Sequence, residues 1–134
     1  MNINNPSFLI GRVKLLLYIA SYSFLSIGLL LLSFSVVVII TTSVLSITNL
    51  FGFDLLDLPK TIYLMLSGII SVYGYIEVGD MINALNSGRF EGLRESLLIW
   101  GFLGLVFGFI LPGFIILFAL LRYYSMLIKV TRVM

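Results

Sequence analysis

The sequence lacks cysteine, histidine and glutamine altogether. Without cysteine the chain has no disulfide bond and no thiol chemistry, and without cysteine and histidine it lacks the usual ligands of zinc and haem. Its serine and threonine hydroxyls have no histidine base to activate them, and no phosphate-binding or dinucleotide-binding glycine motif is present. We therefore expect a protein with no cofactor, no metal ion and no enzymatic activity.

Charged residues are also scarce, at 10% of the chain, whereas 60% of its residues are hydrophobic and the mean hydropathy is +1.17. Soluble domains contain roughly 45–50% apolar and about 25% charged residues. So few charges cannot cover a globule with polar surface, so we expect a single all-α integral membrane domain over residues 1–134. The net charge of +2 comes from scattered basic residues, which gives no footprint for nucleic acid.

The first apolar run is uncharged for 39 residues, from Leu15 to Phe53, and follows Arg12 and Lys14. A signal peptide has an apolar core of only about 7–15 residues, so we expect this segment to be retained. As one helix it would extend about 58 Å, nearly twice the hydrocarbon thickness of roughly 30 Å. No proline interrupts the run, and we expect one long helix over about residues 8–50 whose Thr/Ser-rich end leaves the membrane.

The second helix is expected over about residues 60–87. Gly52, Asp54 and Asp57 are turn and cap residues, and Pro59 suits a helix start because the first N–H groups are unpaired anyway. Gly88 is a plausible residue to terminate this helix.

Two carboxylates lie in the second half of this helix. Glu77 and Asp80 are three residues apart and therefore share one helix face. A carboxylate inside a membrane span costs about 2.5–3.5 kcal/mol and marks an ion or proton path by default. Alternatively the span ends near Tyr75, and both acids lie in the headgroup region close to Arg89 and Arg94. The sequence leaves both interpretations open.

The last apolar stretch has 26 consecutive uncharged residues, from Ser96 to Leu121. Within it, Gly101, Gly104 and Gly108 follow a spacing of three and four, which places them in one stripe of a helix. Small residues let two helix backbones approach closely in lipid. The stripe therefore predicts a close helix contact, with a partner helix in the same chain or in another copy.

Pro112 and Gly113 interrupt this stretch either as a kink or as the turn of a hairpin. A kink gives three crossings and places four basic residues on each side, whereas a hairpin gives four crossings and isolates Lys60 from the other seven. Because basic residues gather on the interior side, we favour the hairpin. We expect four membrane-embedded helices, the last two over about 91–111 and 113–130 and joined at the Pro-Gly turn, with both termini inside.

About a third of the chain resembles the C-terminal half of small hydrophobic membrane proteins of hyperthermophilic archaea and of their spindle-shaped viruses. The resemblance is carried by the runs Asn86–Gly92 (NSGRFEG) and Leu97–Trp100 (LLIW), by Gly104 and Gly108, and by Pro112-Gly113. It implies a helical virion protein, and the greater length of this chain compared with the two-helix coat subunits favours a tail adaptor. The absence of thermally labile glutamine and cysteine agrees with a hyperthermophilic source.

Two functions follow from these features. The first is a structural subunit of a membrane-embedded homo-oligomer that contacts other structural proteins of the same assembly, in a virion shell or a host membrane. The alternative is a small channel or transporter subunit in which Glu77 and Asp80 line a polar path, close to Arg89 and Arg94. The helix-packing residues in either case are Gly101, Gly104, Gly108, Pro112 and Gly113.

Overall fold

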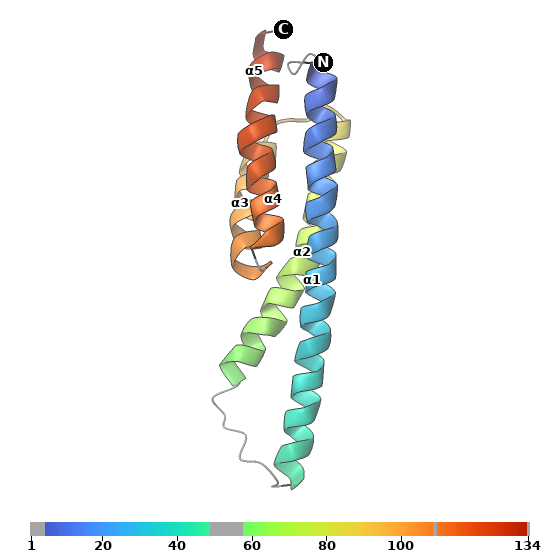
Figure 1. Cartoon of the computed structure of the whole chain (residues 1–134), viewed down its shortest axis with the longest axis vertical. Helices are drawn as coiled ribbons and strands as arrows, with labels where there is room; N and C mark the ends of the chain where they lie inside the picture. Colours follow the sequence, from blue (N-terminus) through green and yellow to red (C-terminus); the bar gives the residue numbers. More distant parts are fainter. Residues whose placement is uncertain (1–4, 49–57, 109, 134) are drawn as a thin grey trace.

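In a computed structural model of the chain, residues 5–48, 58–108 and 110–133 are described, and every element in these ranges is helical. The elements are α1 (Pro6–Thr48), α2 (Leu58–Asn86), α3 (Leu93–Phe107), α4 (Leu111–Phe118), the π-helical segment η2 (Ala119–Tyr124) and α5 (Ser125–Val133). The last three follow one another without a break and form a single rod (Figure 1). The described chain is therefore an all-helical protein of four rods.

The four rods cover different lengths of the molecule (Figure 1). Helix α1 runs from one end to the other, and α2 returns antiparallel to it. Helix α3 then descends only part of the way, and the α4–η2–α5 rod climbs back beside it, so both chain ends lie at the same end of the molecule. Of the described elements, α1 and α2 alone reach toward the opposite end, and α2 leans away from α1 there (Figure 1).

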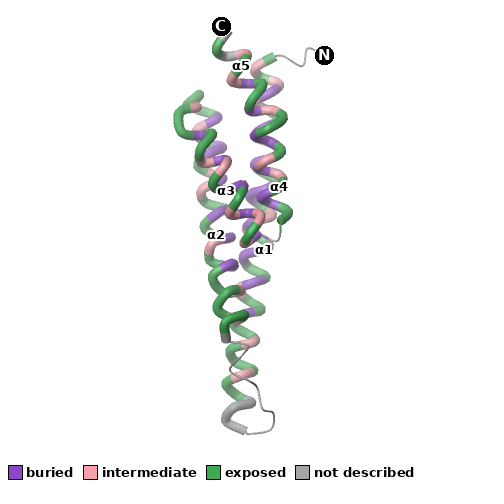
Figure 2. Tube along the Cα trace, turned by 90° about the vertical axis from the view of Figure 1, so that its left-hand side faces the viewer, coloured by how far each residue is buried: buried purple, intermediate pink, exposed green. Residues whose placement is uncertain are grey.

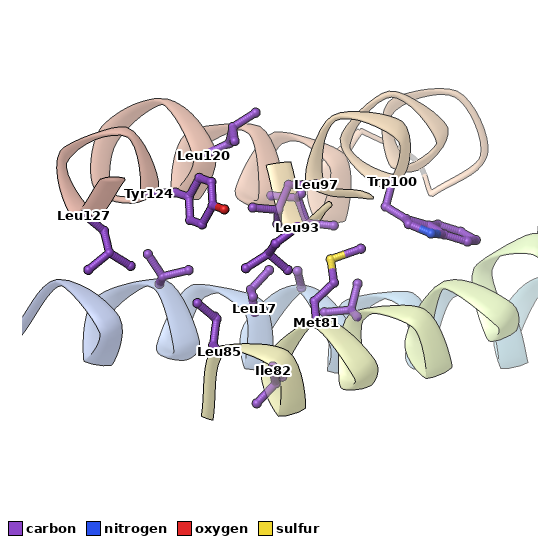
Figure 3. Packing of buried hydrophobic residues seen from close by; sticks show 14 of the residues in the cluster. Leu17, Met81, Ile82, Leu85, Leu93, Leu97, Trp100, Leu120, Tyr124 and Leu127 are labelled. Atoms are coloured by element: carbon purple, nitrogen blue, oxygen red, sulfur yellow. The ribbon is translucent and has the colours of Figure 1, made fainter. Parts of the chain in front are cut away.

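The hydrophobic core lies in the half that contains all four rods (Figure 2). On α1 the buried side chains recur every three or four residues and so form one stripe, which includes Leu9, Val13, Leu17, Ala20 and Phe24. Opposite this stripe, Tyr124 and Leu127 point toward α1 from the last rod (Figure 3), where Leu120 is buried as well. The remaining side chains of this core cluster are Val78, Met81, Ile82 and Leu85 of α2, Leu93, Leu97 and Trp100 of α3 and Ile116 of α4.

A short loop joins α2 to α3 at the end that carries the termini. Helix α2 ends at Asn86, and Gly88 has a φ of +68°, a left-handed conformation that terminates helices. Gly92 repeats this conformation with a φ of +74° directly before α3. The buried Tyr124 donates a hydrogen bond of 3.1 Å from its hydroxyl to the carbonyl of Phe90, which attaches the loop to the last rod.

The hairpin turn between α3 and α4 comes earlier than the expected turn at Pro112-Gly113. Helix α3 ends at Phe107 and is capped by Gly108, whose N–H donates to the Gly104 carbonyl, and α4 already begins at Leu111. Pro112 lies in the first turn of α4, where its missing N–H costs no hydrogen bond. The last two rods therefore do form a hairpin, but the Pro-Gly pair starts its second helix.

Within the part of the chain that the structure describes, three helical stretches are long and apolar enough to cross a membrane: Pro6–Val44, Pro59–Asn86 and Leu111–Val130. Helix α3 is shorter, because its 15 residues extend about 22 Å. Length and composition thus suit membrane association, and they single out α3 as the helix that falls short of a hydrocarbon layer of roughly 30 Å.

Candidate functional site

The glycine stripe of α3 lies against the first turn of α4. A methyl group built on Gly104 would come within 2.6 Å of the backbone nitrogen of Gly113, and one on Gly113 within 2.5 Å of the Gly101 carbonyl oxygen. A methyl group on Gly101 would meet the Leu117 side chain at 2.6 Å. The structure therefore brings these glycines together inside one chain, with α4 as the partner helix.

The remaining members of the stripe extend this contact to α1. A methyl group on Gly108 would come within 2.6 Å of Pro112, and the ring of Phe24 lies 3.3 Å from the same position and 2.9 Å from that on Gly104. Phe24 also meets Trp100 edge to face, with ring centroids 6.1 Å apart. The glycine seam, defined as Gly101, Gly104, Gly108, Pro112 and Gly113, is therefore packed between α1, α3 and α4.

A second close contact, between α1 and α2, was not among the predicted sites. A methyl group on Gly28 would come within 2.9 Å of the Val72 nitrogen, and one on Gly68 within 2.8 Å of the Leu32 side chain. Small side chains continue on both sides of this crossing, where Ser35, Ser67 and Ser71 are buried. The spacing of small residues along α2 is the signal in the sequence that reveals this contact.

Side-chain hydroxyls satisfy backbone groups that would otherwise lie unpaired in an apolar environment. The last carbonyls of a helix have no partner within it. At the end of α3, the Tyr63 hydroxyl donates to the Val106 carbonyl at 2.9 Å and the Ser71 hydroxyl to the Phe107 carbonyl at 3.3 Å. Among the described residues of α1 and the last rod, seven side-chain hydroxyls find an acceptor in the carbonyl four residues earlier: Ser23, Ser33, Ser35, Thr41, Thr42, Ser43 and Ser125. Such pairing suits polar groups surrounded by lipid.

The two carboxylates of α2 lie toward the loop end of the bundle. Glu77 is half-buried and Asp80 is exposed. Both contribute to a cavity of about 220 Å³ that also includes Glu91 and Ser96, and the Glu77 carboxylate interacts with the Tyr73 hydroxyl.

Asp80 also lines a second cavity, of about 320 Å³, between α1 and α2. Its other lining residues include Tyr18, Tyr22 and Tyr75. Arg89 and Arg94 are exposed, and Arg89 donates from Nε to the Ser87 hydroxyl at 3.3 Å. Among the described residues, no group of three acidic side chains is arranged to hold a metal ion.

Large apolar residues are exposed on every rod. Figure 2 shows exposed positions along the length of the rods. The most exposed are Leu121 at 74%, Leu30 at 71% and Ile110 at 64%. Soluble monomers rarely present contiguous apolar patches above a few hundred Å². The exposed set includes Leu29, Phe34, Val37 and Ile40 of α1, Ile62, Leu66 and Ile69 of α2, Phe102 and Val106 of α3 and Phe114 of α4. Exposed apolar side chains of this number are more favourable in contact with lipid than with water.

Comparison with known proteins gives no further assignment. No protein-family model, curated protein or solved structure matches the chain. Function is therefore argued from the glycine seam, the carboxylates and the apolar surface.

Proposed function

We propose that this chain is an integral membrane protein that acts as a structural subunit of a membrane-embedded assembly. The observation that carries the proposal is the apolar surface around all four rods, which includes Leu30, Ile69, Phe102 and Phe114. Burial of apolar side chains stabilises a protein by about 25 cal/mol per Å², so a surface of this size favours lipid or a second copy over water.

A structural role is also supported by the interior of the bundle. The space between α1, α2 and α3 is filled by apolar side chains such as Phe24, Val78, Met81 and Leu97. Glu77 is only half-buried and Asp80 is exposed, so neither carboxylate lies inside the packed core, which gives less support to an ion path than to a packed scaffold.

The oligomer interface must use the outer surface, because the glycine seam is occupied by the chain's own α4 and Phe24. In this proposal the exposed apolar faces of the rods pair with other copies or with lipid. The basic end, which carries Arg12, Arg122 and Lys129, contacts soluble partner proteins. The resemblance of residues 86–113 to proteins of archaeal spindle-shaped viruses supports a virion protein, with a tail adaptor as the best fit.

Native mass spectrometry of the full chain in mild detergent tests the proposal. We expect one closed oligomer of fixed size, and recovery from a particle should also show a second structural protein bound to it. A protein that stays monomeric at every detergent-to-protein ratio would contradict the structural role.

The double variant Glu77→Gln/Asp80→Asn serves as the control for the channel alternative. We expect the same oligomer as for the unmodified chain and no ion flux through vesicles that contain either form. Flux through the unmodified protein that the double variant abolishes would favour the channel.

A further inference from the structure

Two charged residues delimit the apolar part of α2. Lys60 and Asp80 are twenty positions apart, which corresponds to about 30 Å along a helix. This distance equals the hydrocarbon thickness of a typical bilayer. Glu77 lies one turn inside Asp80 and interacts with the Tyr73 hydroxyl. If the chain is embedded as proposed above, α2 crosses the hydrocarbon layer from the level of Lys60 to that of Asp80.

The α3–α4 hairpin ends halfway along this distance. The carbonyl of Phe107, the last residue of α3, accepts a hydrogen bond from Ser71 of α2. Ser71 is eleven positions from Lys60 and nine from Asp80, or about 16 Å and 14 Å along the helix. The uncharged part of α3 is equally short, since Ser96–Phe107 extends only about 18 Å. The tip of the hairpin therefore lies near the bilayer midplane.

Of the described helices, only α1 and α2 continue beyond the tip (Figures 1 and 2). In that half their side chains are exposed on most faces, as Leu30, Phe34 and Ile40 of α1 and Ile62 and Leu66 of α2 show. The leaflet next to the termini thus contains four helices, whereas the other leaflet contains two.

We propose that the α3–α4 hairpin is re-entrant and makes the molecule a wedge that favours bilayers convex on the side of its termini. This inference rests on the proposed membrane embedding. Each helix occupies a cylinder about 10 Å across, so the protein takes up roughly twice the area in one leaflet as in the other. A bilayer pays a free-energy cost to deform around a mismatched protein. That cost is lower in a curved bilayer whose outer, expanded leaflet is the one that contains four helices.

The depth of the hairpin tip tests the first part of the proposal. The chain has no cysteine, so Leu111→Cys at the tip and Leu121→Cys on the same rod each accept one spin label, and both positions are exposed. We expect the label at 111 about 15 Å deeper than the label at 121, and close to the midplane by its accessibility to oxygen. A label at 111 that a water-soluble nickel chelate reaches from the Lys60 side would overturn the re-entrant geometry.

The preference for curvature is tested by measuring how many molecules insert with their termini outward and how many with their termini inward in vesicles of two sizes. Full-length Arg132→Cys and Lys60→Cys proteins, labelled with a fluorophore that external dithionite bleaches, are reconstituted into small sonicated and large extruded vesicles of the same lipids. We expect the outward-to-inward ratio of the termini to be about twofold or more higher in small vesicles, with the Lys60 label changing oppositely. Equal outward-to-inward ratios in small and large vesicles would overturn the wedge. Such a result is expected if second copies of the chain fill the space beside α1 and α2 in the two-helix leaflet. Failure of the protein to float with vesicles would instead contradict membrane embedding itself.

Discussion

At Gly113 the backbones of α3 and α4 approach so closely that a side chain has no room. A methyl group there would overlap the Leu105 nitrogen and lie 2.5 Å from the Gly101 carbonyl oxygen. Because neither neighbour is a flexible side-chain end, we predict that Gly113→Ala lowers the free energy of unfolding by about 1–3 kcal/mol. Titration with a denaturing detergent, followed by circular dichroism, measures the change.

Gly79→Ala is the matched control for this prediction. Gly79 also lies in a helix, but a methyl group there would meet nothing within 4 Å. Alanine is the better helix former, so the control should be neutral or stabilising by up to about 1 kcal/mol. Equal losses in the two variants would show that the α3–α4 contact is not the reason.

Ile110 has an unusual backbone conformation for a residue other than glycine, with a φ of +74° in the turn before α4. A β-branched residue in this region clashes with its own backbone at a cost of about 1–2 kcal/mol. We predict that Ile110→Gly raises the free energy of unfolding by about 1 kcal/mol, because glycine removes the clash. Leu111→Gly, at the exposed first position of α4, is the control and should lower the free energy of unfolding in the same assay. A lower free energy of unfolding in both variants would contradict backbone strain at Ile110.

The end of α3 depends on a neighbouring helix for its hydrogen bonds. The Tyr63 hydroxyl of α2 reaches the Val106 carbonyl at 2.9 Å. In lipid no water replaces a lost donor, and hydrogen bonds between membrane helices are worth about 1 kcal/mol. We predict that Tyr63→Phe lowers the free energy of unfolding by about this amount, whereas Tyr18→Phe, on exposed α1 surface, leaves it unchanged. Similar values for both variants in a detergent titration would rule out this role of Tyr63.

The existence of these helices could be predicted from the sequence better than their turns and contacts. Gly88 ends the helix as its residue type suggests, because a left-handed conformation suits glycine. The hairpin turn was expected at Pro112-Gly113, since proline often marks a break, but proline is equally suited to the first turn of a helix. The sequence contains no glycine at the strained turn position itself, where Ile110 lies.

The contact faces of α1 and α2 are harder to predict from the sequence. Apolar residues surround both helices, so no hydrophobic stripe distinguishes the buried face from the face toward lipid. In lipid it is small residues that mark the face by which a helix contacts another helix. Here these residues are Gly28, Ser67, Gly68 and Ser71. The glycine stripe of α3 was visible for this reason, whereas the single Gly28 within a long apolar run was not.

At the scale of the whole molecule, charge distribution and chain path agree. Both termini lie at one end (Figure 1). Arg12 lies in the first turns of α1 and Lys129 in α5, next to this end, whereas Lys60 lies in the first turn of α2, toward the opposite end. The count of seven basic residues against one does not reveal how deep the hairpin reaches. A hairpin returns the chain to the same side whether it crosses the membrane fully or only halfway.

Labelling from one side of the membrane tests this arrangement. We predict that a membrane-impermeant maleimide modifies Arg12→Cys and Arg132→Cys from the same side in intact cells, and Lys60→Cys only from the other side. Basic residues orient membrane proteins toward the interior, so the first two should react only after the cells are opened. Modification of Arg12→Cys and Arg132→Cys from opposite sides would contradict the hairpin.

The π-helical segment Ala119–Tyr124 gives the last rod a tolerance to changes in chain length. A π turn contains one residue more than an α turn, and Leu121 within it is 74% exposed. Loss of Leu121 would close the segment into an ordinary α turn and leave Tyr124 and Leu127 facing the core. The same deletion in the middle of α1 would rotate every later side chain by about 100°. A homologue that lacks one residue within η2 is therefore compatible with this fold. An alignment gap at that place would leave the core side chains where they are.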